Sequence, residues 1–132
     1  MQTFLPYPDF EASLRALDYR RLGKQRLEAL QLIRAISGET VGWIRHPAAA
    51  MWRGYLNALK QYHNIAIEEW IRRGYRNNMP KKRIRGKIVY PPWLGNEAFH
   101  ASHRSNLLRK DREHYGAFGW TEPDNLPYLW PG

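Results

Sequence analysis

The sequence predicts an all-α protein, a compact single-domain bundle of about four helices with an irregular basic loop and an aromatic C-terminal tail. Three observations lead to this prediction. Apolar residues recur at three- and four-residue spacing, strand-like alternation is almost absent, and 132 residues make one domain of ordinary size. Because 43% of the residues are hydrophobic, a chain of this length can bury a core without disulfides.

The first two helices are predicted from their capping residues and apolar spacing. Asp9 can accept a hydrogen bond from a free backbone N–H, so a short helix is expected from there toward Leu17. A second helix is expected from about Tyr19 to Ser37, with Gly38 as its C-terminal stop. The apolar stripe of this second helix comprises Leu22, Ala29, Leu30, Ile33 and Ile36.

A long third helix is expected from His46-Pro47 to about Arg73, just before Gly74. Proline suits the first helical position because its missing N–H would be unpaired there anyway. At 1.5 Å per residue this helix would span about 40 Å and form the spine of the core. Its stripe comprises Ala48, Met51, Trp52, Tyr55, Leu59, Tyr62, Ala66 and Trp70.

The second half of the chain is predicted to be less regular. Residues 75–95 are rich in proline, glycine and cations and read as an irregular basic loop, in which 88–90 could add a short strand. Asn96 is expected to cap a fourth helix that runs to roughly Lys110. The proline-spaced tail is expected to lie extended over the helices, so residues 1–132 form one domain.

The charge distribution favours a polyanionic partner. Lys and Arg number 21 against 12 Asp and Glu, a formal net charge of +9. Half of the residues in 72–87 are cationic and none is acidic, and aromatic residues are interleaved along the chain. Such a pattern suits phosphate contacts and base stacking. A solvated basic face or an acidic protein partner is the alternative explanation.

Two features that the sequence lacks limit the cellular context that we expect. The sequence has no cysteine, which excludes disulfides, thiolate metal sites and cysteine nucleophiles. No apolar run approaches the ~20 residues of a membrane span. We therefore expect a soluble cytoplasmic protein, associated with the nucleoid or with phage-infected cells, and no membrane partner.

The order of several motifs resembles the phage endonuclease V type of pyrimidine-dimer DNA glycosylase. Residues 18–22, Asp-Tyr-Arg-Arg-Leu, are similar to the start of that family's catalytic helix. His46-Pro47 through Trp70–Tyr75 is similar to its long central helix. Residues 99–105 and 115–119 are similar to its histidine-containing helix and aromatic tail.

This resemblance implies a monomeric helical enzyme that binds duplex DNA, bends it and flips out a nucleotide, without an obligate protein partner. Enzymes of this type use the N-terminal α-amine as a nucleophile on the sugar C1′. An α-amine has a pKa of about 7.7–8.0, against about 10.4 for lysine, so part of it is neutral near pH 7. The resulting imine gives glycosylase and abasic-site lyase activity with no metal and no cofactor.

The chain departs from the family pattern at two catalytic positions. Arg21 stands where the family's Tyr-Arg-Glu-Leu has its catalytic carboxylate, and an arginine cannot act as one. Glu28 is the candidate substitute, because it lies seven residues on, on the same helical face and about 10 Å along the axis. Gln2 is too bulky for removal of the initiator residue, so Met1 would carry the nucleophilic amine. Lys24 is a fallback imine former.

The resemblance and the basic clusters together assign a DNA-contacting set. The three residues with proposed catalytic roles are Met1, Arg21 and Glu28. The predicted DNA contacts are Arg20, Lys24, Arg26, Lys81, Lys82, Arg83, Arg85, His100, His103, Arg104, Arg109 and Lys110. A place in the core is an alternative for His103, and a metal site shared by His100 and His103 is a weaker one. Trp93, Tyr128 and Trp130 are the candidates for stacking on a flipped base.

Three classes of function therefore remain open. The first is a DNA glycosylase and abasic-site lyase for damaged or modified bases. The second, which Arg21 favours, is a non-catalytic DNA-binding protein of the same fold. The third is a metal-dependent nuclease or an RNA-binding protein that uses the basic loop 72–87. The sequence does not identify the base that is recognised, because the shape of the pocket decides it.

Overall fold

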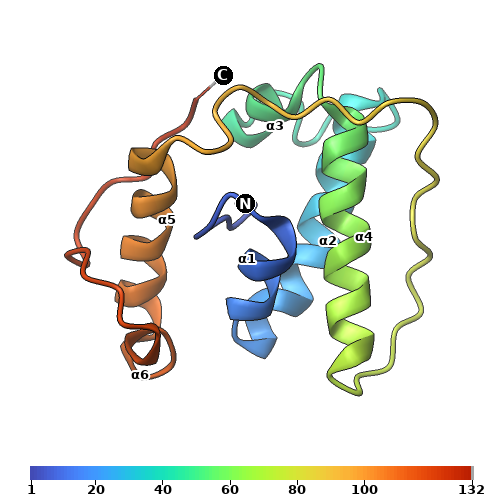
Figure 1. Ribbon diagram of the computed structural model, residues 1–132. Helices are drawn as coiled ribbons and strands as arrows, with labels where there is room; N and C mark the ends of the chain where they lie inside the picture. The colour runs from blue at the N-terminus through green and yellow to red at the C-terminus, as the bar shows by residue number, and fades with distance from the viewer. Residues whose placement is uncertain (132) are drawn as a thin grey trace.

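The computed structural model describes residues 1–131, and these contain helices and no β-strand, which confirms the all-α prediction. Figure 1 shows α2 and α4 side by side, α5 on the far left, and the N-terminal segment with α1 between them. The elements are α1 (Phe10–Ala16), α2 (Tyr19–Ile36), α3 (Pro47–Trp52), α4 (Leu56–Arg72), α5 (Glu97–Lys110), α6 (Arg112–Tyr115) and a 3₁₀ turn (Gly116–Phe118).

Side-chain caps fix where the helices begin. The Asp9 carboxylate accepts from the Ala12 N–H over 2.8 Å and starts α1, as predicted. The amide oxygen of Asn96 accepts from the Phe99 N–H over 3.0 Å and starts α5, also as predicted. Each cap satisfies one of the backbone donors that the first helical turn leaves free.

The prediction of one continuous helix over residues 46–73 is wrong. The chain forms α3 and α4, separated by Arg53, Gly54 and Tyr55. Gly54 has a φ of 89°, in the left-handed region that glycine adopts without strain, and this ends α3. The apolar spacing continues across the break, which explains why periodicity alone suggested a single helix.

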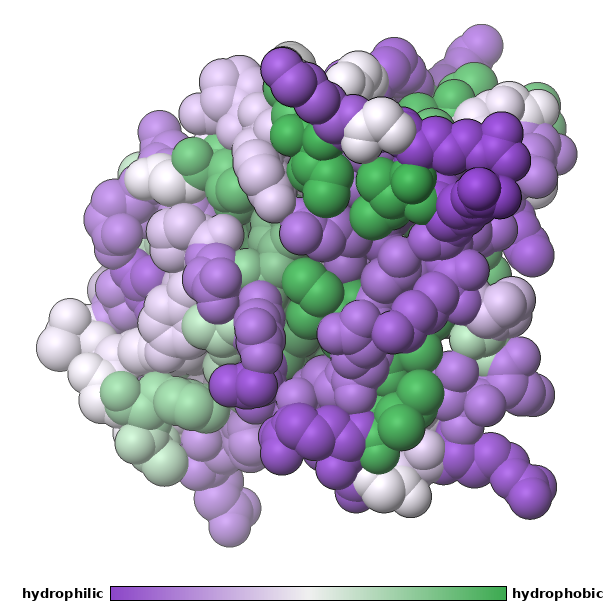
Figure 2. Space-filling model, turned by 45° about the vertical axis from the view of Figure 1, so that its right-hand side comes forward, coloured by the Kyte–Doolittle hydropathy of each residue, from purple (hydrophilic) through white to green (hydrophobic). Residues whose placement is uncertain are grey.

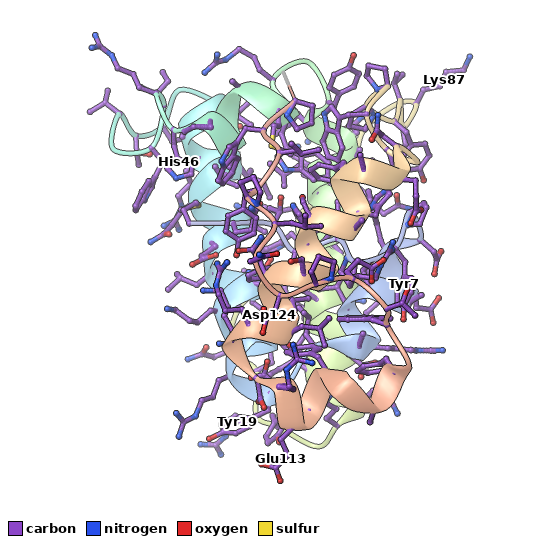
Figure 3. All side chains as sticks on the ribbon, turned by 90° about the vertical axis from the view of Figure 1, so that its left-hand side faces the viewer. Tyr7, Tyr19, His46, Lys87, Glu113 and Asp124 are labelled. Atoms are coloured by element: carbon purple, nitrogen blue, oxygen red, sulfur yellow. The ribbon has the colours of Figure 1, made fainter. Side chains whose placement is uncertain are left out.

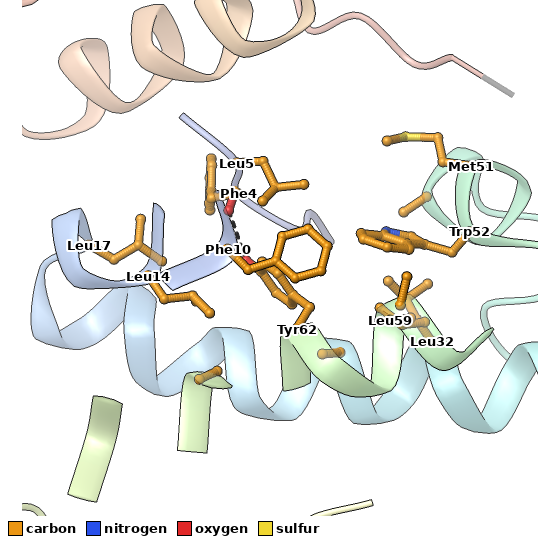
Figure 4. Close-up of a cluster of buried hydrophobic side chains, with 14 of the residues drawn as sticks. Phe4, Leu5, Phe10, Leu14, Leu17, Leu32, Met51, Trp52, Leu59 and Tyr62 are labelled. Atoms are coloured by element: carbon orange, nitrogen blue, oxygen red, sulfur yellow. Dashed lines mark hydrogen bonds between the residues drawn. The ribbon is translucent and has the colours of Figure 1, made fainter. Parts of the chain in front are cut away.

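The predicted core spine is confirmed although the helix is split. Its residues are buried, apart from Tyr55 and Trp70, which are half-buried and packed against the core. Figure 4 shows Trp52 and Tyr62 among leucine side chains from α1, α2 and α4, with Phe4 and Leu5 of the N-terminal segment above them. The N-terminal residues are therefore part of the core.

The loop and tail that follow α4 lie against the helices. Residues 76–90 have no regular secondary structure beyond a bend, so the suggested strand at 88–90 does not form. The tail is held extended along α5, as predicted, by the Leu126 N–H on Ser105 Oγ and by the Asn106 amide on the Leu126 carbonyl. Among residues 1–131, no helix is both long and apolar enough to cross a membrane.

Candidate active site around the N-terminus

The N-terminal segment is buried without forming a helix or strand. Its backbone groups are paired by side chains instead, as burial of a peptide requires. The Phe4 N–H donates to Gln25 Oε1 over 2.9 Å, and the Tyr62 hydroxyl donates to the Phe4 carbonyl over 2.9 Å. Trp52 Nε1 donates to Thr3 Oγ1 over 3.0 Å. These contacts fix the path of the backbone between Met1 and the core.

Three polar residues of α5 complete this anchorage. His103 Nδ1 accepts from the Leu5 N–H over 2.9 Å, and the Arg104 guanidinium donates to the Pro6 carbonyl over 2.7 Å. His100 lies between Leu5 and Gly95, with Nδ1 2.8 Å from the Leu5 carbonyl and Nε2 accepting from the Gly95 N–H. In the neutral tautomer that satisfies both contacts, Nδ1 carries the proton.

The prediction that His100, His103 and Arg104 contact DNA is therefore corrected. The two histidines are fully buried, and Arg104 is 8% exposed and ion-paired with Glu97 and Glu122. Burial lowers the pKa of His103 to about 3, so its ring is neutral and able to accept the Leu5 bond. The alternative of a core position for His103 is confirmed, and all three residues hold the N-terminal segment.

Glu28 lies beside the first peptide group of the chain. Its Oε2 accepts from the Gln2 backbone N–H over 3.1 Å and from Gln25 Nε2 over 3.2 Å. Only the Cα and carbonyl carbon of Met1 separate that amide nitrogen from the α-amine, so covalent geometry places the amine near the carboxylate. The residue suggested as a substitute carboxylate is thus next to the N-terminus.

Met1 and Glu28 line an open cavity of about 1110 Å³. Gln2, Phe4, Gln25 and Tyr128 contribute to its wall. Three acidic residues line it, Asp18, Glu28 and Asp111. Cations outnumber them, and the potential of such a surface attracts a polyanion. The lining cations are Arg15, Arg20, Arg21, Lys24, Arg72, Arg73 and Lys110.

Arg21 faces this cavity as a fixed cation. Its Nη1 lies 3.1 Å from Asp18 Oδ1, and the Asp18 carboxylate also accepts from the Tyr115 hydroxyl. Partial burial alone would raise the pKa of Asp18, but the bonds from Tyr115 and Arg21 outweigh it and the pKa is lowered. Asp18 is therefore ionised at neutral pH and orients Arg21 toward the cavity.

The remaining predicted DNA contacts divide into two groups. Arg20, Lys24 and Lys110 line the cavity and are exposed, so their positions are compatible with the predicted role as DNA contacts. Arg26 and Arg109 do not line it: Arg26 stacks over Trp70 at 4.3 Å, and Arg109 bonds to Asn106. The predicted contacts in the loop lie along α4, outside the cavity. They are Lys81, Lys82, Arg83 and Arg85.

Three cavity arginines were missed as site residues by the sequence reasoning. Arg15 lies in the last turn of α1, Arg72 is the last residue of α4, and Arg73 follows it. Arg73 donates to the Arg15 carbonyl over 3.0 Å, and Arg72 and Arg73 both pair with Glu69, at 2.6 and 2.8 Å. The basic pair before Gly74 was visible in the sequence, but its position opposite the start of α2 depends on how the helices pack.

The fold places the three candidate stacking residues in different environments. Trp93 is buried, with Nε1 donating to the Met51 carbonyl, so its assignment to base stacking is wrong. Tyr128 lines the cavity, and burial raises its pKa to about 12. Trp130 packs between Tyr128 and His46. Among the described residues, no three His, Asp or Glu side chains are grouped so as to hold a metal ion.

Fold and site together define a small helical protein whose cationic cavity surrounds its own N-terminal residue and a carboxylate. The sequence model of one family, described as pyrimidine dimer DNA glycosylase, matches residues 1–83. Because the match covers more than half of the chain, the chain belongs to this family, and the predicted resemblance is confirmed. The family acts on DNA, which makes DNA the partner of this chain.

The matched residues contain the N-terminal segment, α1 to α4 and Glu28. The motifs at 99–105 and 115–119 lie outside them, so that part of the resemblance stays a prediction. The chain matches no curated protein and no solved structure.

Proposed function

We propose that this protein is a DNA glycosylase and abasic-site lyase for damaged pyrimidines, with the α-amine of Met1 as its nucleophile and Glu28 as its catalytic carboxylate. The observation that carries the proposal is the hydrogen bond from the Gln2 N–H to Glu28. This bond ties the carboxylate to the start of the chain, inside a cationic cavity.

The chemistry requires one amine and no cofactor. The lone pair of the neutral amine attacks C1′ of the damaged nucleotide, and the C1′–N bond breaks as the base leaves with the electron pair and takes up a proton. Ring opening gives an imine between C1′ and the amine. Loss of a C2′ proton then expels the 3′ phosphate by β-elimination. An amine held beside a carboxylate suits both the attack and the proton transfers.

In this proposal Glu28 takes the role that the family motif gives to the position of Arg21. Its negative charge stabilises the positive charge that develops at the sugar and on the iminium nitrogen. Gln25 holds the carboxylate by donating to Oε2, while its own Oε1 accepts from the Phe4 N–H and lies 2.7 Å from the Tyr62 hydroxyl. This network pre-positions Glu28 before substrate binds.

Arg21 then serves the phosphate backbone rather than proton transfer. A guanidinium presents paired donors that match a phosphate, and the Asp18 bond limits its freedom. The other cations that line the cavity extend this footprint. Tyr128 offers a ring at the cavity wall against which an extruded base can stack.

The test is a trapping assay with a duplex that carries one abasic site. We expect borohydride to reduce the imine and to leave a covalent protein–DNA adduct, which N-terminal acetylation abolishes. A protein with one extra residue before Met1 is a second control, because the extension moves the amine away from Glu28. A duplex with a single cyclobutane pyrimidine dimer then tests the glycosylase step.

Tight binding to the abasic duplex without any adduct would contradict the proposal. That result would favour the non-catalytic DNA-binding protein, in which Arg21 marks the loss of the reaction. An adduct that survives acetylation would instead place the imine on a side-chain amine such as Lys24, which also lines the cavity.

A further inference from the structure

The loop cations form a surface that the cavity does not use. Residues 81–87, called here the 81–87 strap, run as an extended chain along α4, and none of them lines the cavity. Figure 1 shows this segment on the outer side of α4, with the N-terminus on the other side of that helix. The face turned forward in Figure 2 is hydrophilic over most of its area.

Side chains of α4 hold the strap by its backbone. Asn57 donates to the carbonyls of Arg85 and Lys87 over 2.8 and 2.9 Å. Asn64 bonds the Lys82 carbonyl and N–H, at 2.8 and 2.7 Å, and Lys60 reaches the Arg83 carbonyl. From Asn57 to Asn64 the helix rises about 10 Å, so the strap is held at points spread over about two helical turns. These side chains of α4 thus hold the strap in place through its backbone groups.

The clamped backbone gives the strap one exposed cationic edge. Successive residues of an extended chain point to opposite sides. Lys82 and Ile84 are accordingly half-buried against the helix, whereas the odd-numbered cations are exposed. Among the described residues Lys81 pairs with Glu68, and the other three have no acidic partner. The edge consists of Lys81, Arg83, Arg85 and Lys87, and Figure 3 shows Lys87 projecting from the molecule.

This edge and the N-terminal segment are on opposite sides of α4. Tyr62 points to the N-terminal segment, because its hydroxyl donates to the Phe4 carbonyl. Lys60 and Asn64, which hold the strap, are each two residues from Tyr62, a rotation of about 200° around the helix. The full width of α4 therefore separates the strap from the residues that lead to Met1.

We propose that the 81–87 strap is a second DNA-binding surface, which holds another duplex segment while the cavity engages the first. The inference rests on the proposed function, since that function places DNA in the cavity. The charge of the strap matches phosphate, and a second stretch of the same polymer is the polyanion present at highest local concentration around a DNA-bound protein. The protein is then a bridge between two duplexes.

The test is a two-colour capture assay with the full-length protein. One short undamaged duplex is immobilised, protein is added, and retention of a second labelled duplex is measured as salt increases. The variant R83Q/R85Q removes two strap cations. The matched control R34Q/R45Q removes two exposed cations that line neither surface.

We expect the wild-type protein and the control to retain the second duplex up to higher salt than R83Q/R85Q does. Each phosphate contact contributes about 0.9 to the slope of log affinity against log salt, so the slope for the second duplex should fall by about 1.8. Trapping on a short abasic duplex should be unchanged in R83Q/R85Q. This second readout separates the strap from the cavity, because a cavity defect would reduce trapping.

Three results would overturn the inference. The first is a wild-type protein that retains no second duplex. The second is retention by R83Q/R85Q equal to that of the control, which would point to bridging by a protein dimer. The third is capture of single-stranded RNA in preference to duplex DNA. Loss of the borohydride adduct with bridging intact would instead count against the proposed function alone.

Discussion

The backbone amide of Gln2 donates a hydrogen bond to the carboxylate of Glu28 over 3.1 Å. The two residues are 26 positions apart, and the contact depends on an N-terminal segment that passes through the core before it reaches α2. Because the bond forms at the first peptide group, it brings the Glu28 carboxylate to within one residue of the α-amine. The proposed reaction depends on this one relationship.

Replacing Glu28 with glutamine tests the carboxylate directly. The Glu28→Gln variant keeps an oxygen that can accept from Gln2 but loses the negative charge. Loss of one electrostatic stabiliser typically lowers kcat about 100- to 1000-fold, and we expect an effect of this size on adduct formation. Single-turnover trapping on an abasic duplex measures it. Asp111→Asn, a second cavity acid, is the control and should keep near-wild-type rates.

Removing the charge of Arg21 tests the proposed phosphate contact. We expect Arg21→Gln to bind duplex DNA more weakly and to lower the salt slope by about 0.9, the value of one phosphate contact. Binding titrations at several salt concentrations measure both quantities. Arg34→Gln, an exposed cation outside the cavity, should leave the slope unchanged. An unaltered slope in the Arg21 variant would remove this residue from the DNA footprint.

Removing the Tyr62 hydroxyl tests how the N-terminal segment is held. The hydroxyl donates to the Phe4 carbonyl and also contacts Gln25 at 2.7 Å in a fully buried position. Tyr62→Phe leaves the buried Phe4 carbonyl without this donor, which costs about 1–3 kcal/mol in free energy of unfolding. Urea denaturation measures the loss. Tyr19→Phe changes an exposed tyrosine and should be neutral, so equal stabilities for the two variants would contradict the anchoring role.

The buried His103 predicts a dependence of stability on pH. Its pKa is about 3 in the folded protein, below the ordinary value of 6.5 that applies when the chain is unfolded. Between these values the unfolded state binds the proton and the folded state does not. The stability is therefore complete above pH 6.5 and is lost as pH falls, with a slope of up to about 1.4 kcal/mol per pH unit.

The variant His103→Asn checks this pH dependence. An asparagine oxygen can still accept from the Leu5 N–H, but the side chain does not titrate. The lowered pKa values of Asp18 and His100 also make the folded protein less stable toward acid. Both residues are present in the wild-type protein and in the variant, so their contribution is the same in each. We expect a shallower decline in the variant between pH 6.5 and 4, measured by urea denaturation at each pH. Parallel curves would show that His103 does not contribute.

Chelation separates the proposed enzyme from a metal-dependent nuclease. Imine chemistry needs only the amine and a carboxylate, so adduct formation should be unchanged in excess EDTA. Strand cleavage that stops with EDTA and returns with added Mg²⁺ would support the nuclease. The same reaction with a divalent ion supplied from the start serves as the reference.

Local signals predicted the parts of the fold that depend on neighbouring residues. The Asp9 and Asn96 caps and the apolar spacing of α2 each act within one or two helical turns, and these elements form where expected. The break at Gly54 was missed, because the apolar repeat runs through it. The low helix propensity of glycine was the one feature of the sequence that indicated a break at this position.

The site could be predicted only in part, because it joins distant segments. Glu28 was identified as the nearest carboxylate on the right helical face, but its contact with Gln2 depends on the tertiary path. His100, His103 and Arg104 were assigned to DNA contacts as part of a basic cluster, with a core position as the alternative for His103. They are buried because the N-terminal segment forms no regular structure and needs side-chain partners for its backbone.

The most direct test of the central claim is to locate the trapped nucleotide by mass spectrometry. Borohydride-reduced adduct, digested with nuclease and trypsin, should carry the sugar remnant on the peptide of residues 1–15, at the α-amine of Met1. The peptide that contains Lys24 should be unmodified. A remnant on Lys24, or on any other side chain, with a free Met1 amine would contradict the account.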